Sequence, residues 1–312
     1  MPDTDATILL GYDGSDDAEM AIRAAGRLLA PRRAVVVYVW DSLAELLLNT
    51  DIETLYDPIQ EPARLLDEEE RDQASEVARR GAELAGEAGF HALPVIARGK
   101  PKAWPTLLDL ARQHDAAALV VGSRGLGGVK SALLGSVSSG VLDHAHLPVL
   151  IVPPLDADPP SGPALAGYDG SEQAGAAIEA AGRLLSGREL VVQTVWLSCV
   201  ATAAAGVAGM PAGVALKGAQ EIDAGLREGA RRTAERGAAL ATEHGLDARA
   251  DALGGQGNVW NTLLGAARDQ RASAVVLGSR GRSAFASNIL GSVSRALVHH
   301  APAPVLVVRP PS

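Results

Sequence analysis

Aromatic residues, lysine and cysteine are all scarce in this chain of 312 residues. Phe, Trp and Tyr make up 3% of the sequence, so we expect cores built mainly from alanine, valine and leucine. The single cysteine, Cys199, cannot form a disulfide within the chain, and no Cys/His spacing typical of a metal site is present. These absences favour a reducing compartment, and we expect a cytoplasmic protein without a metal site.

The sequence also lacks a segment suited to a membrane. The longest apolar stretch, residues 200–216, is interrupted by glycine and proline and is short for a bilayer span. The first residues are acidic and precede no apolar run, so we expect no signal peptide. The formal net charge is −9, whereas nucleic-acid-binding surfaces concentrate Lys and Arg. We therefore expect neither a membrane nor a nucleic acid as a partner.

Several familiar motifs are missing as well. The chain contains no G-x-x-x-x-G-K-[ST] loop, no G-x-G-x-x-G fingerprint and no G-x-S-x-G elbow. Four histidines precede the last predicted strands of the two halves, but no cluster of Asp, Glu or Cys accompanies them as further metal ligands. We interpret them as C-terminal helix residues that interact favourably with the helix dipole. They are His144, His146, His299 and His300.

The chain does contain one pattern written twice, at a constant offset of 156 residues. A signature of Gly-Ser-Arg-Gly, nine residues and Gly-Ser starts at Gly122 and again at Gly278. The same offset relates Gly-Tyr-Asp-Gly-Ser at Gly11 to its copy at Gly167. A period this long indicates a duplicated domain rather than a solenoid. We expect a first domain over residues 1–153, a linker over 154–162 and a second domain over 163–312.

Each half alternates between segments typical of strands and of helices. Short valine-rich runs predict buried parallel strands, and longer stretches with apolar residues at helical spacing predict helices. This alternation predicts α/β domains whose parallel sheets are covered by helices on both faces. In the first half we expect strands at 7–12, 34–40, 92–97, 117–122 and 148–152, and helices at 16–29, 68–88, 104–114 and 136–144. In the second half we expect strands at 163–168, 189–195, 247–253, 274–278 and 304–308, and helices at 172–185, 221–244, 259–270 and 292–300.

The halves differ most between the second strand and the long helix. Residues 43–67 are acidic and contain two prolines, whereas residues 200–216 form a Gly/Ala segment without charge. A long connector beside a ligand site is often a lid. A surface loop without a role is an equally good interpretation of either segment.

The glycine signature falls where an anion could bind. Gly122 ends a buried strand, and Gly135-Ser136 begins a helix, with Ser136 predicted as its N-cap. A helix N-terminus offers unpaired N–H groups and the positive end of a dipole. Glycines let the backbone approach an anion, and Arg124 could add a positive charge. Glycines after a strand are also common in plain turns. We therefore infer the anion site from the whole repeated signature rather than from any one residue.

Asp13 adds a second element to this predicted site. It follows the first strand, where its carboxylate could meet a ribose hydroxyl or a base edge. Capping of the first helix is an almost equally good interpretation. In an open parallel sheet the ends of strands one and four flank the crevice where ligands bind, so we expect Asp13 and Gly122 to lie together.

The combined pattern resembles the universal stress protein family, in its ATP-binding branch and in a tandem two-domain form. The resemblance covers nearly the whole chain and includes the terminal Pro-Val-Leu-x-Val strand of each half. It implies two Rossmann-like domains, each a five-stranded parallel sheet in the order 3-2-1-4-5, with ATP, alone or with Mg²⁺, at the carboxyl edge. It also implies pairing through the last strands, as a homodimer or as a pseudo-dimer within one chain; the alternative is that each strand is covered by its own connector.

The resemblance also implies the site residues, carried over by position. Asp13 and Val39 would contact the adenosine of one ATP, and Asp169 and Val195 that of a second. The cradle for the first set of phosphates would consist of Gly122, Arg124, Gly125, Gly135, Ser136, Val137 and Ser138. The cradle for the second would consist of Gly278, Arg280, Gly281, Gly291, Ser292, Val293 and Ser294.

We therefore expect a stress-response or signalling regulator that binds one ATP per domain and acts on a signalling partner that the sequence does not identify. The pattern contains no evident general base, so we expect no enzyme, although slow ATP hydrolysis would fit. Two alternatives remain: an adenine-nucleotide hydrolase or transferase, and an interaction module without a ligand. Cys199 has no activating neighbour in sequence, which favours a structural role.

Overall fold

A computed structural model describes residues 6–29, 32–40, 56–99, 102–126, 134–155, 160–185, 187–200, 212–281 and 290–309. The chain forms two compact units, one mainly from residues up to Pro154 and the other mainly from Leu155 onward. The expected linker, 154–162, includes both of these residues, and its bounds stay a prediction.

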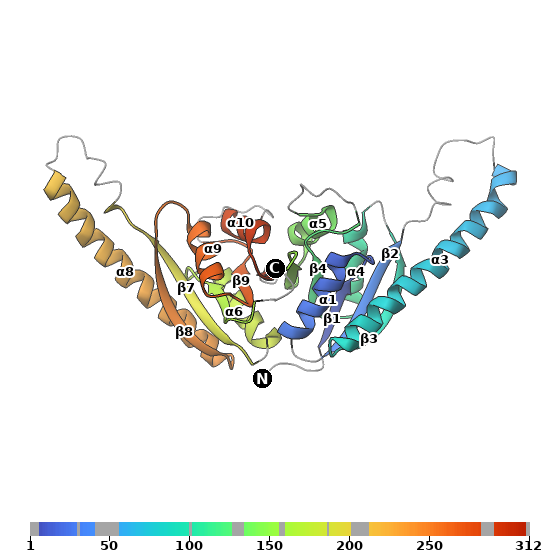
Figure 1. Cartoon of the computed structure of the whole chain (residues 1–312), viewed down its shortest axis with the longest axis horizontal. Helices are drawn as coiled ribbons and strands as arrows, with labels where there is room; N and C mark the ends of the chain where they lie inside the picture. Colours follow the sequence, from blue (N-terminus) through green and yellow to red (C-terminus); the bar gives the residue numbers. More distant parts are fainter. Residues whose placement is uncertain are drawn as a thin grey trace. The chain divides into compact units, whose positions relative to one another are not determined.

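Each unit contains a five-stranded parallel sheet in the predicted order 3-2-1-4-5 (Figure 1). Leu9 at the centre of the first sheet pairs with Val35 on one side and Leu119 on the other. The first sheet has the order β3-β2-β1-β4-β5, with β1 (Thr7–Gly11), β2 (Arg33–Trp40), β3 (His91–Arg98), β4 (Ala116–Gly122) and β5 (Val149–Val152). The second has the order β8-β7-β6-β9-β10, with β6 (Ala164–Gly167), β7 (Glu189–Leu197), β8 (Asp247–Gly255), β9 (Ala274–Gly278) and β10 (Val305–Val308).

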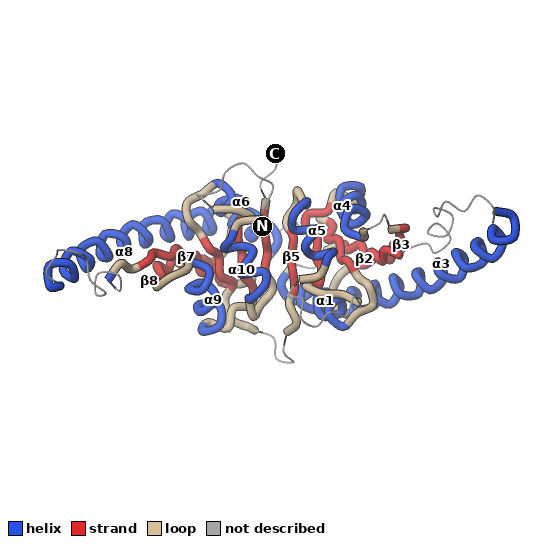
Figure 2. Tube along the Cα trace, turned by 90° about the horizontal axis from the view of Figure 1, so that it is seen from above, coloured by secondary structure: helices blue, strands red, loops and turns tan. Residues whose placement is uncertain are grey.

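Helices cover both faces of each sheet, as Figure 2 shows. In the first unit α1 packs with α3 on one face, and α4 packs with α5 on the other. In the second unit α6 packs with α8, and α9 packs with α10. The helices of the first unit are α1 (Asp16–Leu28), α3 (Tyr56–Glu87), α4 (Ala103–Gln113) and α5 (Ser136–His144). Those of the second are α6 (Glu172–Leu184), α8 (Ala212–Glu243), α9 (Val259–Asp269) and α10 (Ser292–His300).

The cores consist mainly of alanine, valine, leucine and isoleucine, as the composition predicted. Ile8, Leu9 and Leu119 are among the fully buried side chains of the first unit, and Leu165 and Leu190 are among those of the second. Burial on both faces explains why these strands are continuous apolar runs rather than alternating ones.

Close contact between each long helix and a tyrosine determines where the loop after the first strand lies. A Cβ added at Gly81 of α3 would lie 2.5 Å from Tyr12 Cδ1, and one added at Gly237 of α8 would lie 2.6 Å from Tyr168 Cδ1. Only glycine lets the helix approach this closely. The tyrosine immediately precedes the aspartate of the predicted site in each unit, so this packing positions the site.

The long helices begin earlier than predicted, at Tyr56 rather than residue 68 and at Ala212 rather than residue 221. Pro58 falls in the first turn of α3, where a helix tolerates proline because the missing N–H would have no partner there. Each helix has 32 residues and so extends about 48 Å, about twice the length of the strands that it covers. The remaining parts of the predicted connectors, 43–55 and 201–211, lie outside the described residues, and a lid there stays a prediction.

Candidate functional site

The carboxyl ends of β1, β2 and β4 surround a pocket of about 580 Å³ in the first unit. Small-ligand sites have volumes of roughly 300–1,000 Å³. The start of α5 and one end of α4 complete the wall. All nine residues that the sequence analysis placed in the first site line this pocket: Asp13, Val39, Gly122, Arg124, Gly125, Gly135, Ser136, Val137 and Ser138.

Asp13 joins the loop after β1 to the glycine loop after β4. Its Oδ1 accepts a hydrogen bond from Ser15 N at 3.0 Å, and its Oδ2 accepts one from Leu126 N at 3.1 Å. The N-cap of α1 is Ser15, so the interpretation of Asp13 as the helix cap is wrong. A carboxylate has about four acceptor sites. The Ser15 hydroxyl also donates to Oδ1, at 2.5 Å. Asp13 can therefore still accept about one hydrogen bond from a hydroxyl group of a ligand.

The N-cap of α5 differs by one residue from the prediction. Gly135 is the N-cap and Ser136 is the first helical residue, so the prediction of Ser136 as N-cap was wrong. The physical reason is that Gly135 N donates to Ser123 O at 2.7 Å, which holds residue 135 in an extended conformation. By helix geometry the N–H groups of Ser136, Val137 and Ser138 have no acceptor within α5. A cap without a side chain leaves these donors open to an anion.

Ser138 attaches α5 to the end of β4. Its hydroxyl is buried and donates to Gly122 O at 2.8 Å. Ser294 makes the equivalent bond to Gly278 O at 2.7 Å in the second unit. The resemblance placed Ser138 in the phosphate cradle, and the structure uses its hydroxyl inside the protein. The backbone N–H of Ser138 remains for a ligand.

The second glycine of each signature lies directly against the site aspartate. A Cβ added at Gly125 would overlap Asp13 Oδ2, and one added at Gly281 would lie 2.8 Å from Asp169 Oδ2. A side chain at either position would displace the carboxylate. Glycine at this position therefore lets the aspartate carboxylate lie directly against the glycine loop.

The second unit repeats this arrangement with its own residues. Asp169 Oδ1 accepts a hydrogen bond from Ser171 N at 2.9 Å, and Gly291 N donates to Ser279 O at 2.8 Å. Gly291 is the N-cap of α10. The nine predicted residues of the second site lie at or near the carboxyl ends of β6, β7 and β9 and at the start of α10; they are Asp169, Val195, Gly278, Arg280, Gly281, Gly291, Ser292, Val293 and Ser294.

The arginine of the signature differs between the units. Arg124 Nε lies 3.0 Å from Asp17 Oδ2, and both side chains are partly exposed. In the second unit Gln173 occupies the position of Asp17. Arg280 Nε is buried and has no hydrogen-bond partner among the described residues. One arginine is therefore held by a carboxylate, and the other is not.

Sequence reasoning predicted Val39 but missed the rest of the apolar wall of the pocket. Tyr12, Trp40 and Leu107 line it, and each is nearly buried in the structure. Burial and the neighbouring Glu19 carboxylate raise the pKa of Tyr12, so its hydroxyl stays protonated. The repeat contained a signal for two of these residues, because Tyr12 and Trp40 recur in the second half at the offset of 156 residues.

The environment of Cys199 agrees with a structural role. Its backbone N donates to Asp223 Oδ1 at 2.9 Å, and its thiol lies 3.2 Å from the same oxygen. The hydrogen bond to the Asp223 carboxylate, together with burial, raises the pKa of the Cys199 thiol. A raised pKa reduces the thiolate fraction and so the reactivity. This neighbour comes from α8 and was invisible in the sequence.

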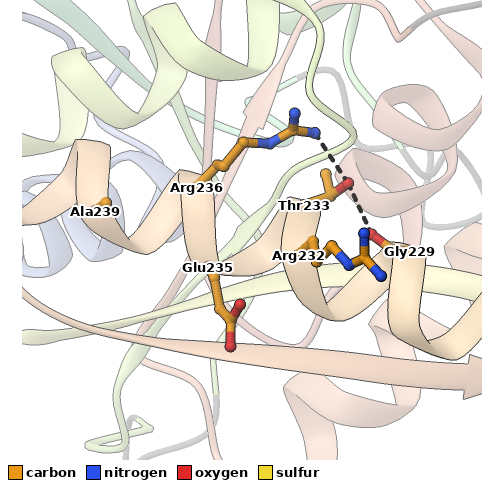
Figure 3. A pocket seen from close by; sticks show the side chains of 6 residues that line it. All are labelled: Gly229, Arg232, Thr233, Glu235, Arg236 and Ala239. Carbon is orange, nitrogen blue, oxygen red and sulfur yellow. Dashed lines mark hydrogen bonds between the residues drawn. The ribbon is translucent and has the colours of Figure 1, made fainter.

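A shallow groove of about 570 Å³ lies on α8 and brings together none of the predicted site residues (Figure 3). Its lining comes from one helix and includes Arg232 and Arg236. Arg232 Nε bonds Glu228 Oε1 at 2.9 Å, and Arg236 Nη2 bonds Thr233 Oγ1 at 3.2 Å. The groove is thus a charged helix surface outside the candidate site.

Two of the four histidines, His144 and His300, stack on tryptophans in the structure. The His144 ring stacks on Trp104 with the ring centroids 4.1 Å apart, and the His300 ring stacks on Trp260 at 5.8 Å. In the described part of the chain, no group of three or more His, Cys, Asp or Glu residues is arranged to hold a metal ion. None of the helices there is long and apolar enough to span a bilayer.

Comparison with known protein families matches the universal stress protein family twice, over residues 6–153 and over residues 162–309. This chain belongs to the universal stress protein family. The tandem two-domain form that the repeat predicted is confirmed by the two matches.

Mycobacterial universal stress proteins are among the similar sequences. Universal stress protein Rv2623 of Mycobacterium tuberculosis is 30% identical over 314 residues, which cover 97% of this chain and 96% of that protein. Universal stress protein Rv1996 of the same species is 36% identical over 211 residues, which cover 66% of this chain and 62% of that protein. The present chain thus matches less than two thirds of the length of Rv1996 and nearly all of Rv2623.

Among solved structures, a universal stress protein from Archaeoglobus fulgidus has the same fold over nearly the whole chain. The TM-score is 0.64 at 21% identity, and the match covers 97% of this chain and 98% of that one. The likeness confirms two α/β domains with parallel sheets and flanking helices.

Proposed function

We propose that each unit binds one ATP at the carboxyl edge of its sheet, and that ATP binding changes the affinity of the protein for a signalling partner in a stress response. The observation that carries this proposal is the first pocket, where a helix start, a glycine loop and a carboxylate surround one cavity of about 580 Å³. Membership of the universal stress protein family supports it.

The phosphate groups would lie between the glycine loop and the start of α5. The N–H groups of Ser136, Val137 and Ser138 have no helical acceptors, and these residues line the pocket at the positive end of the α5 dipole. Gly125 has no side chain that would fill this space. The same elements recur in the second unit at α10 and Gly281.

The adenosine would lie toward β1 and β2. Val39, Trp40 and Leu107 supply an apolar wall for a purine ring, and Asp13 lines the same pocket with acceptor capacity left for about one ribose hydroxyl. Apolar walls with a few polar groups are typical of cofactor sites. Mg²⁺ bound with ATP would be held mainly by phosphate oxygens and water, as this ion generally is.

The residues of the pocket favour binding over turnover. Neither histidine nor lysine occurs among the described lining residues, and Asp13 is the carboxylate there. Both oxygens of Asp13 already accept hydrogen bonds from backbone N–H groups, which favours a positioning role rather than activation of water. Slow hydrolysis of bound ATP is compatible with this arrangement.

The test is calorimetric titration of the purified chain with ATP and Mg²⁺, followed by chromatography of the nucleotide after incubation. We expect two ATP per chain and little conversion. Turnover in the usual enzyme range of about 1–10³ per second would contradict the proposal and favour a hydrolase, and release of pyrophosphate would favour a transferase. Absence of binding would favour an interaction module. A cytoplasmic location, and pairing through β5 and β10 in a homodimer or within one chain, stay predictions.

A further inference from the structure

The two cradles have the same motif but different charges beside them. The first turn of α1 contains Asp16, Asp17 and Glu19, whereas that of α6 contains Glu172 as its acidic residue. The repeat offset places Gln173 at the position of Asp17 and Gly175 at that of Glu19. The second unit has therefore lost two carboxylates at the helix that borders its glycine loop.

The first lost carboxylate binds the arginine of the signature in the first unit. Arg124 Nε and Asp17 Oδ2 are 3.0 Å apart, and the Asp17 side chain is 20% exposed. An ion pair of this kind orients the guanidinium and offsets its charge. A phosphate that approaches Arg124 must compete with Asp17 and is repelled by it.

In the second unit the same arginine has no such competitor. Arg280 has the neutral Gln173 at the position of Asp17, and its Nε is buried without a hydrogen-bond partner among the described residues. A buried donor without an acceptor destabilises the protein, and this cost is removed when an anion accepts its hydrogen bond. A planar guanidinium suits phosphate because it can donate two parallel bonds.

A second arginine likewise binds a carboxylate in the first unit, whereas its counterpart binds a neutral group in the second. Arg80 Nη2 bonds Glu19 Oε1 at 2.7 Å in the first unit. Its counterpart Arg236 bonds the Thr233 hydroxyl at 3.2 Å instead (Figure 3). A Cβ added at Gly170 would lie 3.8 Å from Arg236 Nη2, which places this charge beside the loop that contains the site aspartate.

We propose that the two sites are unequal and that the second is the tighter and more salt-sensitive site for polyphosphate. This inference rests on the proposed function and adds a ranking to it. Arg280 is available to phosphate, whereas Arg124 is bound by Asp17. At limiting ATP the second site therefore fills first, and the chain responds to ATP in two steps.

The test isolates each site in the full-length chain. Gly125→Val leaves the second site, and Gly281→Val leaves the first. Calorimetric titration with ATP is expected to give about tenfold tighter binding to the Gly125→Val protein, which is about 1.4 kcal/mol. Adenosine, which has no phosphate, is expected to bind the two proteins with a much smaller difference. Raising the salt concentration should weaken ATP binding more at the second site, since the attraction is between charges.

Exchange of the distinguishing residue sharpens the test. Asp17→Gln in the Gly281→Val protein should tighten ATP binding about tenfold, and Gln173→Asp in the Gly125→Val protein should weaken it about tenfold. Asp16→Asn is the matched control, because it removes the same charge from the same helix turn at an exposed position. Its expected effect is less than about twofold, since screening weakens exposed charges.

The outcomes separate this inference from the function on which it rests. Equal ATP affinity in the two single-site proteins, or exchanges that leave both affinities unchanged, would overturn the ranking while the ATP sites stand. Absence of ATP and adenosine binding in a folded wild-type chain would overturn the proposed function itself.

Discussion

The first and second units share a backbone arrangement and differ in the partners of their arginines. Both place an aspartate after the first strand, a glycine against its carboxylate and a serine hydroxyl on the end of the fourth strand. The first unit then pairs Arg124 with Asp17, while the second leaves Arg280 Nε without a partner in the described chain. Duplicated sites can therefore keep one motif and still differ in electrostatics, because the residue that decides the charge lies outside the motif.

The largest expected effect comes from filling either cradle. Gly125→Val and Gly281→Val should each abolish one of the two ATP sites, because the new side chain would displace Asp13 or Asp169 and occupy the space of the phosphates. Calorimetric stoichiometry measures this as one equivalent instead of two.

A matched control for these variants lies in α3. A Cβ added at Gly86 would meet no heavy atom within 4 Å, so Gly86→Val makes the same substitution in open space and should still bind two equivalents. Two equivalents of ATP in either cradle variant would show that the phosphates lie elsewhere.

The next largest effect concerns the serines that attach α5 and α10 to the sheets. Ser138→Ala leaves Gly122 O with one buried partner fewer and should destabilise the first unit by about 1–3 kcal/mol. Ser294→Ala should do the same to the second unit. Hydrogen exchange resolved by peptide assigns the loss to one unit. Ser75→Ala, on the exposed surface of α3, is the control and should change stability little. Equal loss of protection in both units after either substitution would contradict the independence of the two attachments.

The units should also differ in their response to acid. Burial lowers the pKa of His299, and the nearby His300 and Arg295 lower it further. The folded state thus binds this proton less readily than the unfolded state, so the contribution of His299 to stability is complete above the ordinary pKa of 6.5 and is lost as the pH falls below it. Asp143 occupies this position in the first unit. We expect His299→Gln to reduce the loss of second-unit stability between pH 7 and pH 5, measured by hydrogen exchange. An unchanged pH dependence would contradict this.

The smallest expected effect is at the exposed ion pair of the first unit. Glu19→Gly reproduces the second unit by removing the carboxylate that binds Arg80 at 2.7 Å. Surface pairs contribute about 0–1 kcal/mol, so stability should fall by no more than that, plus a helix-propensity cost of about 1 kcal/mol. Comparing the thermal unfolding of Glu19→Gly with that of Glu19→Ala separates the loss of the ion pair from the helix-propensity cost of glycine. A loss well above 2 kcal/mol would show that the Tyr12–Glu19 contact at 3.4 Å matters more than the ion pair.

Most of the fold could be predicted from the sequence because its patterns are local. The valine-rich runs and the repeat located every strand of both sheets to within about two residues, and α5 and α10 begin and end where predicted. The starts of α3 and α8 were missed by about ten residues. Pro58 and the Gly/Ala sequence before residue 217 are weak helix signals. Leu65 and Val214 are exposed there, so among the described side chains no buried apolar face marks these first turns in the sequence.

The candidate site was predictable in its backbone and less so in its side-chain partners. The glycines, Asp13 and the helix start follow from motif spacing, since each lies at a strand end. The Arg124–Asp17 pair joins residues 107 positions apart, so no local pattern contains it. The buried bond from Ser138 to Gly122 and the cap at Gly135 likewise depend on how α5 meets β4.

The most direct test of the account is the amount and identity of nucleotide released when freshly purified protein is denatured, by chromatography and mass spectrometry. Two sites predict up to two ATP per chain, with the second site occupied first when the total is lower, as Gly125→Val and Gly281→Val proteins would show. Protein that contains no nucleotide and takes up no added ATP in calorimetry would contradict ATP binding by either unit.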